Sequence, residues 1–219
     1  MNKMVEASQR GAVGAMYEDL INDLNLTGEE KEYFMDLLMF RQMTNMDAGM
    51  KMMGGNLSDE EKKELTDQIK EANELVKTEM KDFLNDEDDY SEFEFFEKTQ
   101  GERMMLSQAE ATLNGTDNAF SDETYRELLE MMHDEKKNFD FNSDLQDESN
   151  MNMSPERFSP QNIQSFVDDK GRLNETIFNK AQGILTAEQL EAFKDAVKMT
   201  ADMQQAQMEM MSQMFGGRK

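Results

Sequence analysis

Residues 185–189 read Leu185-Thr186-Ala187-Glu188-Gln189, and related segments occur twice upstream. They are Leu26-Thr27-Gly28-Glu29-Glu30 and Leu57-Ser58-Asp59-Glu60-Glu61. In each, a Thr or Ser is followed three residues later by Glu or Gln, which is the capping box that opens an α-helix. Leu185 before the cap and Leu190 after it add a hydrophobic staple. The three segments therefore predict the starts of three helices.

Apolar residues recur every three or four positions after each capping box, as they do on the buried face of an amphipathic helix. Gly is sparse and there are only two Pro, so little in the chain interrupts helices. We expect an all-α fold of six or seven mostly long amphipathic helices, packed as an antiparallel helical bundle or cradle. The expected helices cover residues 13–24, 27–53, 58–84, 90–113, 121–137, 159–183 and 186–215, with a loose start over 1–12 and a solvated turn over 85–89.

A polar segment divides the expected helices. Residues 138–158 are rich in Asn, Asp and Ser and contain Pro155, a composition that favours a loop or hinge. We therefore expect an N-terminal helical region over 1–137, a polar loop or hinge over 138–158, and a C-terminal helical hairpin over 159–219. The hairpin should pack on the first region, so that the whole chain forms one domain.

The chain is strongly acidic, with 47 Asp and Glu against 23 Lys and Arg and a net charge of −24. Such a surface repels phosphate groups, so we expect neither nucleic acid nor anionic membranes as partners. No stretch of the sequence is long and apolar enough to span a membrane. Residues 1–12 have no apolar run, so we expect no signal peptide within them. The chain has no Cys, which removes disulfides and thiolate chemistry.

Methionine is the most unusual part of the composition, with 23 residues. Many fall in stripes with helical spacing, from Met35 to Met53 and from Met199 to Met214. A stripe of this kind most often packs into a core. Because Met is flexible and polarisable, it can instead line a surface that adapts to varied apolar segments. The sequence leaves both interpretations open.

The C-terminal helix is the candidate binding site, because its apolar residues occupy too wide an arc to be buried by one neighbour. We expect this end to pack against a second protomer, giving a homodimer, or against apolar protein clients. The candidate residues for client or dimer binding are Met199, Met203, Met208, Met210, Met211, Met214 and Phe215.

Metal and catalytic sites have less support in the sequence. Thioethers one helical turn apart could share a soft ion such as Cu(I) or Ag(I), and whether any metal binds stays open. Glu130 and His133 form an E-x-x-H pattern, but a di-iron bundle needs two copies and the chain has one His. Residues 140–144 begin like a calcium loop, yet Leu145 replaces the turn Gly and Met151 replaces the bidentate Glu. No nucleophile motif or Gly-rich phosphate loop is present. We expect no enzyme, no catalytic residues and no cofactor.

The segment around residues 185–189 resembles the LTxxQ signature of a family of bacterial periplasmic helical proteins related to the chaperone Spy. Asp23-Leu24-Asn25-Leu26-Thr27-Gly28-Glu29-Glu30 is similar to the first copy of this signature, with Glu30 in place of Gln. The resemblance implies an exported α-helical protein, often a cradle-shaped dimer, that acts as an ATP-independent chaperone, an envelope-stress regulator or a metal sensor. The chain departs from the family in its acidic charge and in helices inserted around residues 58–158.

Together, the sequence and the resemblance predict a non-enzymatic, exported, chaperone-like or envelope-stress factor that binds apolar client segments on Met-rich helix faces. One alternative is a metal-responsive periplasmic sensor that uses Met thioethers and carboxylates. Another is a purely structural or adaptor helical protein. We expect a periplasmic or otherwise exported location, with the export signal or anchor outside the sequence given, and a cytoplasmic location stays open.

Overall fold

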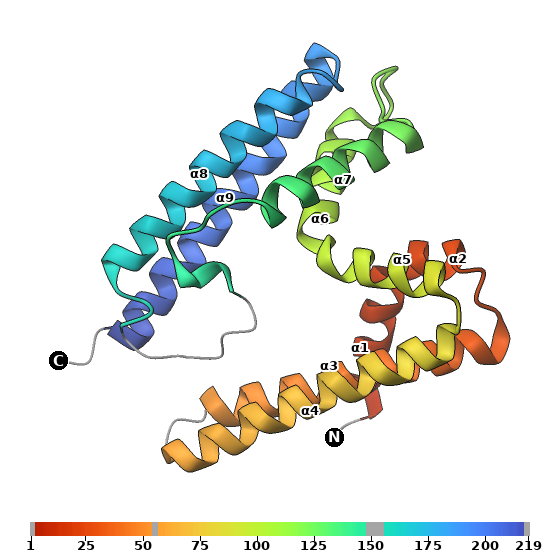
Figure 1. Cartoon of the computed structure of the whole chain (residues 1–219), viewed down its shortest axis with the longest axis vertical. Helices are drawn as coiled ribbons and strands as arrows, with labels where there is room; N and C mark the ends of the chain where they lie inside the picture. The colour runs from red at the N-terminus through yellow and green to blue at the C-terminus, as the bar shows by residue number, and fades with distance from the viewer. Residues whose placement is uncertain (1–2, 54–56, 148–155, 217–219) are drawn as a thin grey trace. The chain divides into compact units, whose positions relative to one another are not determined.

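The computed structural model describes residues 3–53, 57–147 and 156–216, and its regular structure within them is helical throughout (Figure 1). The predicted all-α fold is therefore confirmed for this part of the chain. The described residues form nine α-helices, more than we expected, and one 3-10 helix. These are α1 (Lys3–Met16), α2 (Glu18–Asp23), α3 (Gly28–Met53), α4 (Asp59–Leu84), α5 (Glu87–Lys98), α6 (Gln100–Leu113), α7 (Asp122–Lys137), η1 (Asp144–Gln146), α8 (Pro160–Ala181) and α9 (Ala187–Gly216).

Two of the three predicted capping boxes form in full. At the start of α4, the N–H of Glu61 donates to the Ser58 hydroxyl at 3.3 Å, and the N–H of Ser58 donates to the Glu61 carboxylate at 2.7 Å. Thr186 and Gln189 make the same reciprocal pair at the start of α9, with distances of 3.3 and 3.0 Å. Each box satisfies backbone N–H groups that a helix start would otherwise leave unpaired.

The box at the start of α3 forms only in part. The Glu30 carboxylate accepts from the N–H of Thr27 at 3.2 Å and from its hydroxyl at 3.3 Å. The N–H of Glu30 donates instead to the Thr27 carbonyl at 2.9 Å. Gly28 between them has a φ of +46°, a left-handed conformation that Gly adopts without the steric penalty of a side chain. The helix therefore starts in an irregular turn.

Residues 1–97 form one compact unit, whose described part contains α1 to α5 up to Glu97. The long helices α3 and α4 lie side by side (Figure 1). The α3 methionines differ in burial, because Met35 and Met39 are buried and Met52 packs on a second cluster of Ala48, Leu65 and Ile69, whereas Met50 is 55 % exposed. The main core consists of Val13, Tyr17, Leu20, Ile21, Phe34, Met35, Leu38, Met39, Val76, Met80, Leu84, Phe93 and Phe96.

A polar network joins α3 and α5 within this unit. The Arg41 guanidinium donates to the two carboxylate oxygens of Glu97 at 2.5 and 3.0 Å, and to the Tyr17 hydroxyl oxygen at 3.0 Å. The Tyr17 hydroxyl in turn donates to Glu97. Burial alone would lower the pKa of Arg41, but its bonds to Glu97 outweigh that effect and raise the pKa. The Arg41 guanidinium therefore stays charged, and its bidentate contact fixes the position of α5.

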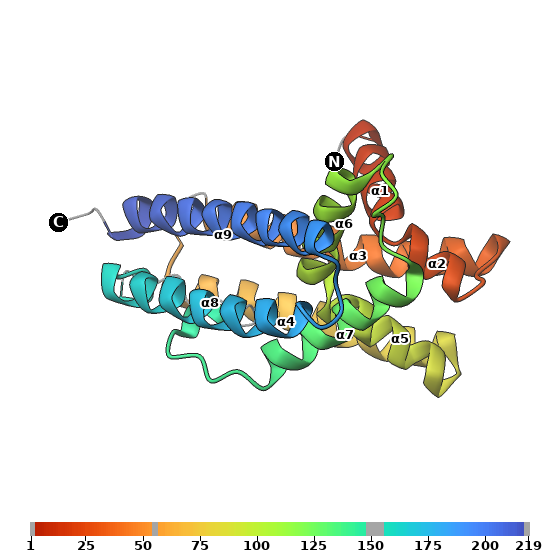
Figure 2. The ribbon, with the colours of Figure 1, turned by 90° about the horizontal axis from the view of Figure 1, so that it is seen from above.

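Residues 98–219 form the second compact unit, whose described part contains α6 to α9. Helices α8 and α9 lie side by side in both views (Figures 1 and 2). Helix α9 packs on α6, and α8 packs on α7. The buried residues of these four helices include Leu106, Ala109, Leu113, Leu128, Leu129, Met132, Leu173, Ile177, Ala181, Phe193, Ala196 and Val197.

Two helix starts differ from the prediction. The segment expected to be loose is helical where it is described, because α1 begins at Lys3. Helix α5 begins at Glu87, inside the turn expected over residues 85–89. There the Asp86 carboxylate accepts from the backbone N–H groups of Asp88 and Asp89 at 2.8 and 3.3 Å. The acidic run is therefore partly a helix cap, a role that Asp favours.

The single helix expected over residues 90–113 is two helices. Thr99 interrupts it with φ −111° and ψ 10°, outside the helical region. Its buried hydroxyl accepts from the Arg103 side chain at 3.2 Å. Thr has only moderate helix propensity, and its hydroxyl offers the local bond that stabilises a non-helical residue.

Along the chain, the boundary between the two compact units falls between Glu97 and Lys98, whereas the sequence placed a hinge at residues 138–158. The described part of that segment, with η1, belongs to the second unit and packs on α8. The hairpin of α8 and α9 does pack on helices that precede the segment, because α6 and α7 contact it. The polar composition of the segment marks a connection within a unit.

Candidate functional site

Helix α9 is much longer than α6, one of the helices that pack on it. It has 30 residues and α6 has 14, which correspond to lengths of about 45 Å and about 21 Å. The two run antiparallel, since Gln108 lies 3.4 Å from Thr200 while Glu102, nearer the start of α6, lines the same groove as Gln204. Because α6 begins at Gln100, the part of α9 that follows Gln204 extends past it.

One face of α9 changes from buried to exposed along the helix. Ala192 and Ala196 are buried at the start of this face. Met199, Met203 and Met210 continue it at helical spacing and are 53 %, 45 % and 61 % exposed. We call these three residues the α9 methionine stripe. They are the sequence-predicted site residues that the structure presents to solvent.

Met208, another predicted site residue, lies on a different side of α9. Met208 is half-buried and lies two residues, or about 200° of helix rotation, from Met210. It packs against a cluster of Leu145, Phe158, Ile163 and Phe166. Its thioether is therefore part of the core. The side chains of Met211, Met214 and Phe215 lie outside the described residues.

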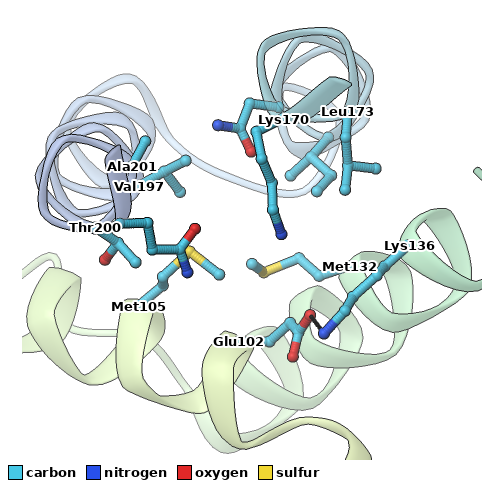
Figure 3. Close-up of a pocket in the computed structure, with 12 residues that line it drawn as sticks. Glu102, Met105, Met132, Lys136, Lys170, Leu173, Val197, Thr200 and Ala201 are labelled. Atoms are coloured by element: carbon cyan, nitrogen blue, oxygen red, sulfur yellow. Dashed lines mark ion pairs between the residues drawn. The ribbon is translucent and has the colours of Figure 1, made fainter. Parts of the chain in front are cut away.

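A small groove opens between α6, α7, α8 and α9 (Figure 3). Lys136 pairs with one carboxylate oxygen of the buried Glu102 at 3.1 Å. The second oxygen of Glu102 is buried and has no hydrogen-bond partner among the described residues. In Figure 3 the Lys170 ammonium and the thioethers of Met105 and Met132 point toward the groove.

The groove is too small for an organic ligand. Its cavity of about 40 Å³ exceeds the minimum for one water molecule, but organic ligands occupy several hundred. Two thioethers could attract a soft metal ion, yet the ammonium groups of Lys136 and Lys170 would repel it. The lining therefore favours ordered water near Glu102, and the α9 methionine stripe is the stronger candidate site.

The E-x-x-H pattern of α7 has local partners. Glu130 is exposed and accepts from Arg126 at 2.6 Å, while His133 is half-buried. No group of three or more His, Asp or Glu side chains that could hold a metal ion occurs in the described part of the chain. Among these residues, Glu130 and His133 therefore lack the further carboxylate or imidazole that a metal site would need.

The segment that begins like a calcium loop is bound to α8. The Asp169 carboxylate accepts from the N–H groups of Asn142 and Ser143 at 2.6 and 3.0 Å, and from the Arg172 guanidinium at 2.6 Å. Burial raises the pKa of Asp169, but the hydrogen bonds from Arg172, Ser143 and Asn142 outweigh it and hold the pKa below its usual value. Asp144 accepts from Asn162 at 2.5 Å. The polar residues of this loop thus position it on α8.

Sequence reasoning missed a second role of Gln189. Its carbonyl oxygen completes the capping box, while its amide nitrogen donates to the carbonyls of Asn118 and Ala119 at 3.1 and 3.4 Å. The side chain therefore joins the start of α9 to the loop between α6 and α7. The sequence signal for this role was Gln in place of Glu at position 189, because only Gln has an amide N–H that can donate to the loop carbonyls.

None of the described helices is long and apolar enough to cross a membrane. Comparisons of the chain with protein-family models, curated proteins and solved structures found no match.

Proposed function

We propose that this chain is a non-enzymatic binding protein that holds apolar segments of client proteins on the α9 methionine stripe. Three large apolar side chains with helical spacing are exposed there, and this observation carries the proposal. Thioether side chains adapt their shape to different apolar partners, which suits a chaperone-like role with varied clients.

The charge of this region also supports a protein partner. The chain as a whole carries −24, but residues 198–216, the described end of α9, contain one basic and two acidic side chains. An apolar segment approaching this end therefore meets little of the charge that surrounds the rest of the molecule. Clients with basic flanks would in addition be attracted by the acidic remainder.

The expected affinity is low. Full burial of a Met side chain contributes about 1.5–3 kcal/mol, and each stripe residue has about half of its surface left to bury. Three such residues supply roughly 2–5 kcal/mol, which by itself corresponds to about millimolar binding. Tighter binding needs further contacts along α9. Weak contact with rapid release fits transient protection of unfolded clients.

The exported location and the envelope-stress role rest on the LTxxQ resemblance of residues 185–189 and belong to the proposal. A second copy of the chain is the other partner that could cover the stripe, which would give a homodimer through α9. A soft-metal sensor is the second candidate function, favoured by the exposed thioethers of Met199 and Met203 one helical turn apart.

The test replaces all three stripe residues with Gln, which keeps their length and helix propensity but removes the apolar surface. Aggregation of an unfolded model protein is followed by light scattering with and without the variant. We expect the Met199→Gln, Met203→Gln, Met210→Gln protein to lose most of its suppression while keeping its helical circular dichroism.

A matched control carries Met16→Gln and Met50→Gln, which are equally exposed but lie in the first unit. This control should suppress aggregation as the parent protein does. Equal suppression by the stripe variant and the parent would show that clients do not bind this face. Sedimentation of both variants separates client binding from self-association.

A further inference from the structure

The methionines in the described part of the chain differ widely in their access to solvent. Met80 and Met132 are 0 % and 1 % exposed, whereas the α9 methionine stripe is about half exposed. The chain has no Cys, so no thiol competes with the thioethers for an oxidant. Reactive sulfur on the surface of this protein is therefore methionine sulfur.

We propose that Met199, Met203 and Met210 form an oxidation site that switches the stripe from apolar to polar. The co-reactant is a two-electron oxidant of the hypochlorous acid class. The sulfur lone pair takes chlorine from HOCl and releases hydroxide; water then attacks the sulfur, chloride leaves and two protons are lost. The thioether is oxidised to a sulfoxide, and the chlorine is reduced to chloride.

Because the stripe is exposed, oxidation of its side chains can be reversed without unfolding and refolding of the protein. Oxidation of a buried methionine would place a polar S=O group in the core and destabilise the fold. The stripe side chains are about half exposed, so their sulfoxides can be hydrated without unfolding α9. Methionine sulfoxide reductases can restore the thioethers. Oxidation therefore alters the surface while the core methionines stay protected.

The regulatory consequence rests on the proposed function. Sulfoxides remove much of the apolar gain that holds a client, so we expect binding to weaken about tenfold or more, since a tenfold change corresponds to only about 1.4 kcal/mol. The modification site itself stands on the exposure of the three side chains and does not depend on client binding.

The first measurement maps oxidation on the full chain. The protein is treated with increasing molar equivalents of HOCl, and peptide mass spectrometry gives the order in which methionines gain oxygen. The stripe should be oxidised before Met80 and Met132, while circular dichroism stays unchanged. Oxidation of the buried pair at the same equivalents as the stripe would overturn the site.

The second measurement compares aggregation suppression before and after treatment in two triple variants. One carries Met199→Leu, Met203→Leu and Met210→Leu, which cannot be oxidised at the stripe. The control variant removes the same number of exposed thioethers elsewhere and carries Met16→Leu, Met50→Leu and Met104→Leu.

For each protein the treated activity is divided by its own untreated activity. This ratio should fall about tenfold in the parent and the control, stay near its untreated value in the stripe variant, and recover in the parent after reduction of the sulfoxides. An equal fall in both variants would overturn the switch. If the untreated parent does not suppress aggregation, the proposed function is wrong and the switch falls with it, while the peptide map still decides the oxidation site.

Discussion

The side chain of Gln189 offers the sharpest test of how this sequence builds its second unit. It is 8 % exposed and makes contacts in two directions, with Thr186 in its own capping box and with the carbonyls of Asn118 and Ala119. Gln189→Glu keeps the carbonyl oxygen that accepts from Thr186. It replaces the amide donor with a second oxygen, which faces two backbone carbonyls.

The magnitude follows from these contacts. The bond at 3.1 Å is lost outright, the one at 3.4 Å is weak, and an oxygen of the new carboxylate, at a position that is buried in the parent, is left without a donor. Leaving a buried polar group unsatisfied costs about 1–3 kcal/mol, and repulsion between the new carboxylate and the carbonyls adds to it. We expect the variant to be destabilised by roughly 2–3 kcal/mol at neutral pH.

The pH dependence has a definite sign. The carbonyls favour the protonated form of the new carboxyl, so its pKa is higher in the folded protein than in the unfolded chain. A group with a raised folded pKa stabilises the fold most when protonated, and that stabilisation is lost as the pH rises through the folded pKa. The difference from the parent should therefore shrink in acid, where the protonated carboxyl donates to the loop as the amide does.

Urea unfolding followed by circular dichroism measures the free energy difference, and amide hydrogen exchange locates it at the start of α9. The matched control is Glu61→Gln, the reverse exchange in the exposed capping box of α4, where Glu61 accepts only from Ser58. The control should change stability much less. Equal stability of parent and Gln189→Glu protein at neutral pH, or a difference that does not shrink in acid, would refute the argument.

Three further predictions follow from other contacts. Asp169→Asn removes the charged acceptor of four hydrogen bonds and should destabilise the protein by about 2–3 kcal/mol in urea at neutral pH. The folded pKa of Asp169 is lowered, so the parent should lose this advantage as the pH falls through that pKa, and a pH-independent difference would contradict the assignment. Glu97→Gln breaks a half-buried bidentate ion pair and should lower the urea stability of the first unit by about 1.5–3 kcal/mol, which an unchanged unfolding midpoint would disprove. If the stripe binds soft metals, titration with Cu(I) or Ag(I) should show at least micromolar binding. The double variant Met199→Leu, Met203→Leu should weaken this binding, and the control Met50→Leu should not. No binding above background would remove the sensor alternative.

Local sequence determined the helices of this protein. Capping boxes and apolar periodicity depend on residues three or four positions apart, so the starts of α4 and α9 could be placed within a residue. The same logic failed at Thr99, where a buried hydroxyl and not a Gly or Pro ends the helix. It also failed at Asp86, whose acidic neighbours suggested a turn and instead begin α5.

Tertiary structure alone decided which methionines are core and which form a surface. Periodicity placed Ala196, Met199, Met203 and Met210 on one face, but it carries no information on where a neighbouring helix ends. That depends on how the neighbouring helices lie around α9, since Met199 is 53 % exposed although the next residue, Thr200, is buried beside Gln108 of α6. The sequence therefore determined the stripe, and the packing of the neighbouring helices around α9 decided which of its residues face solvent.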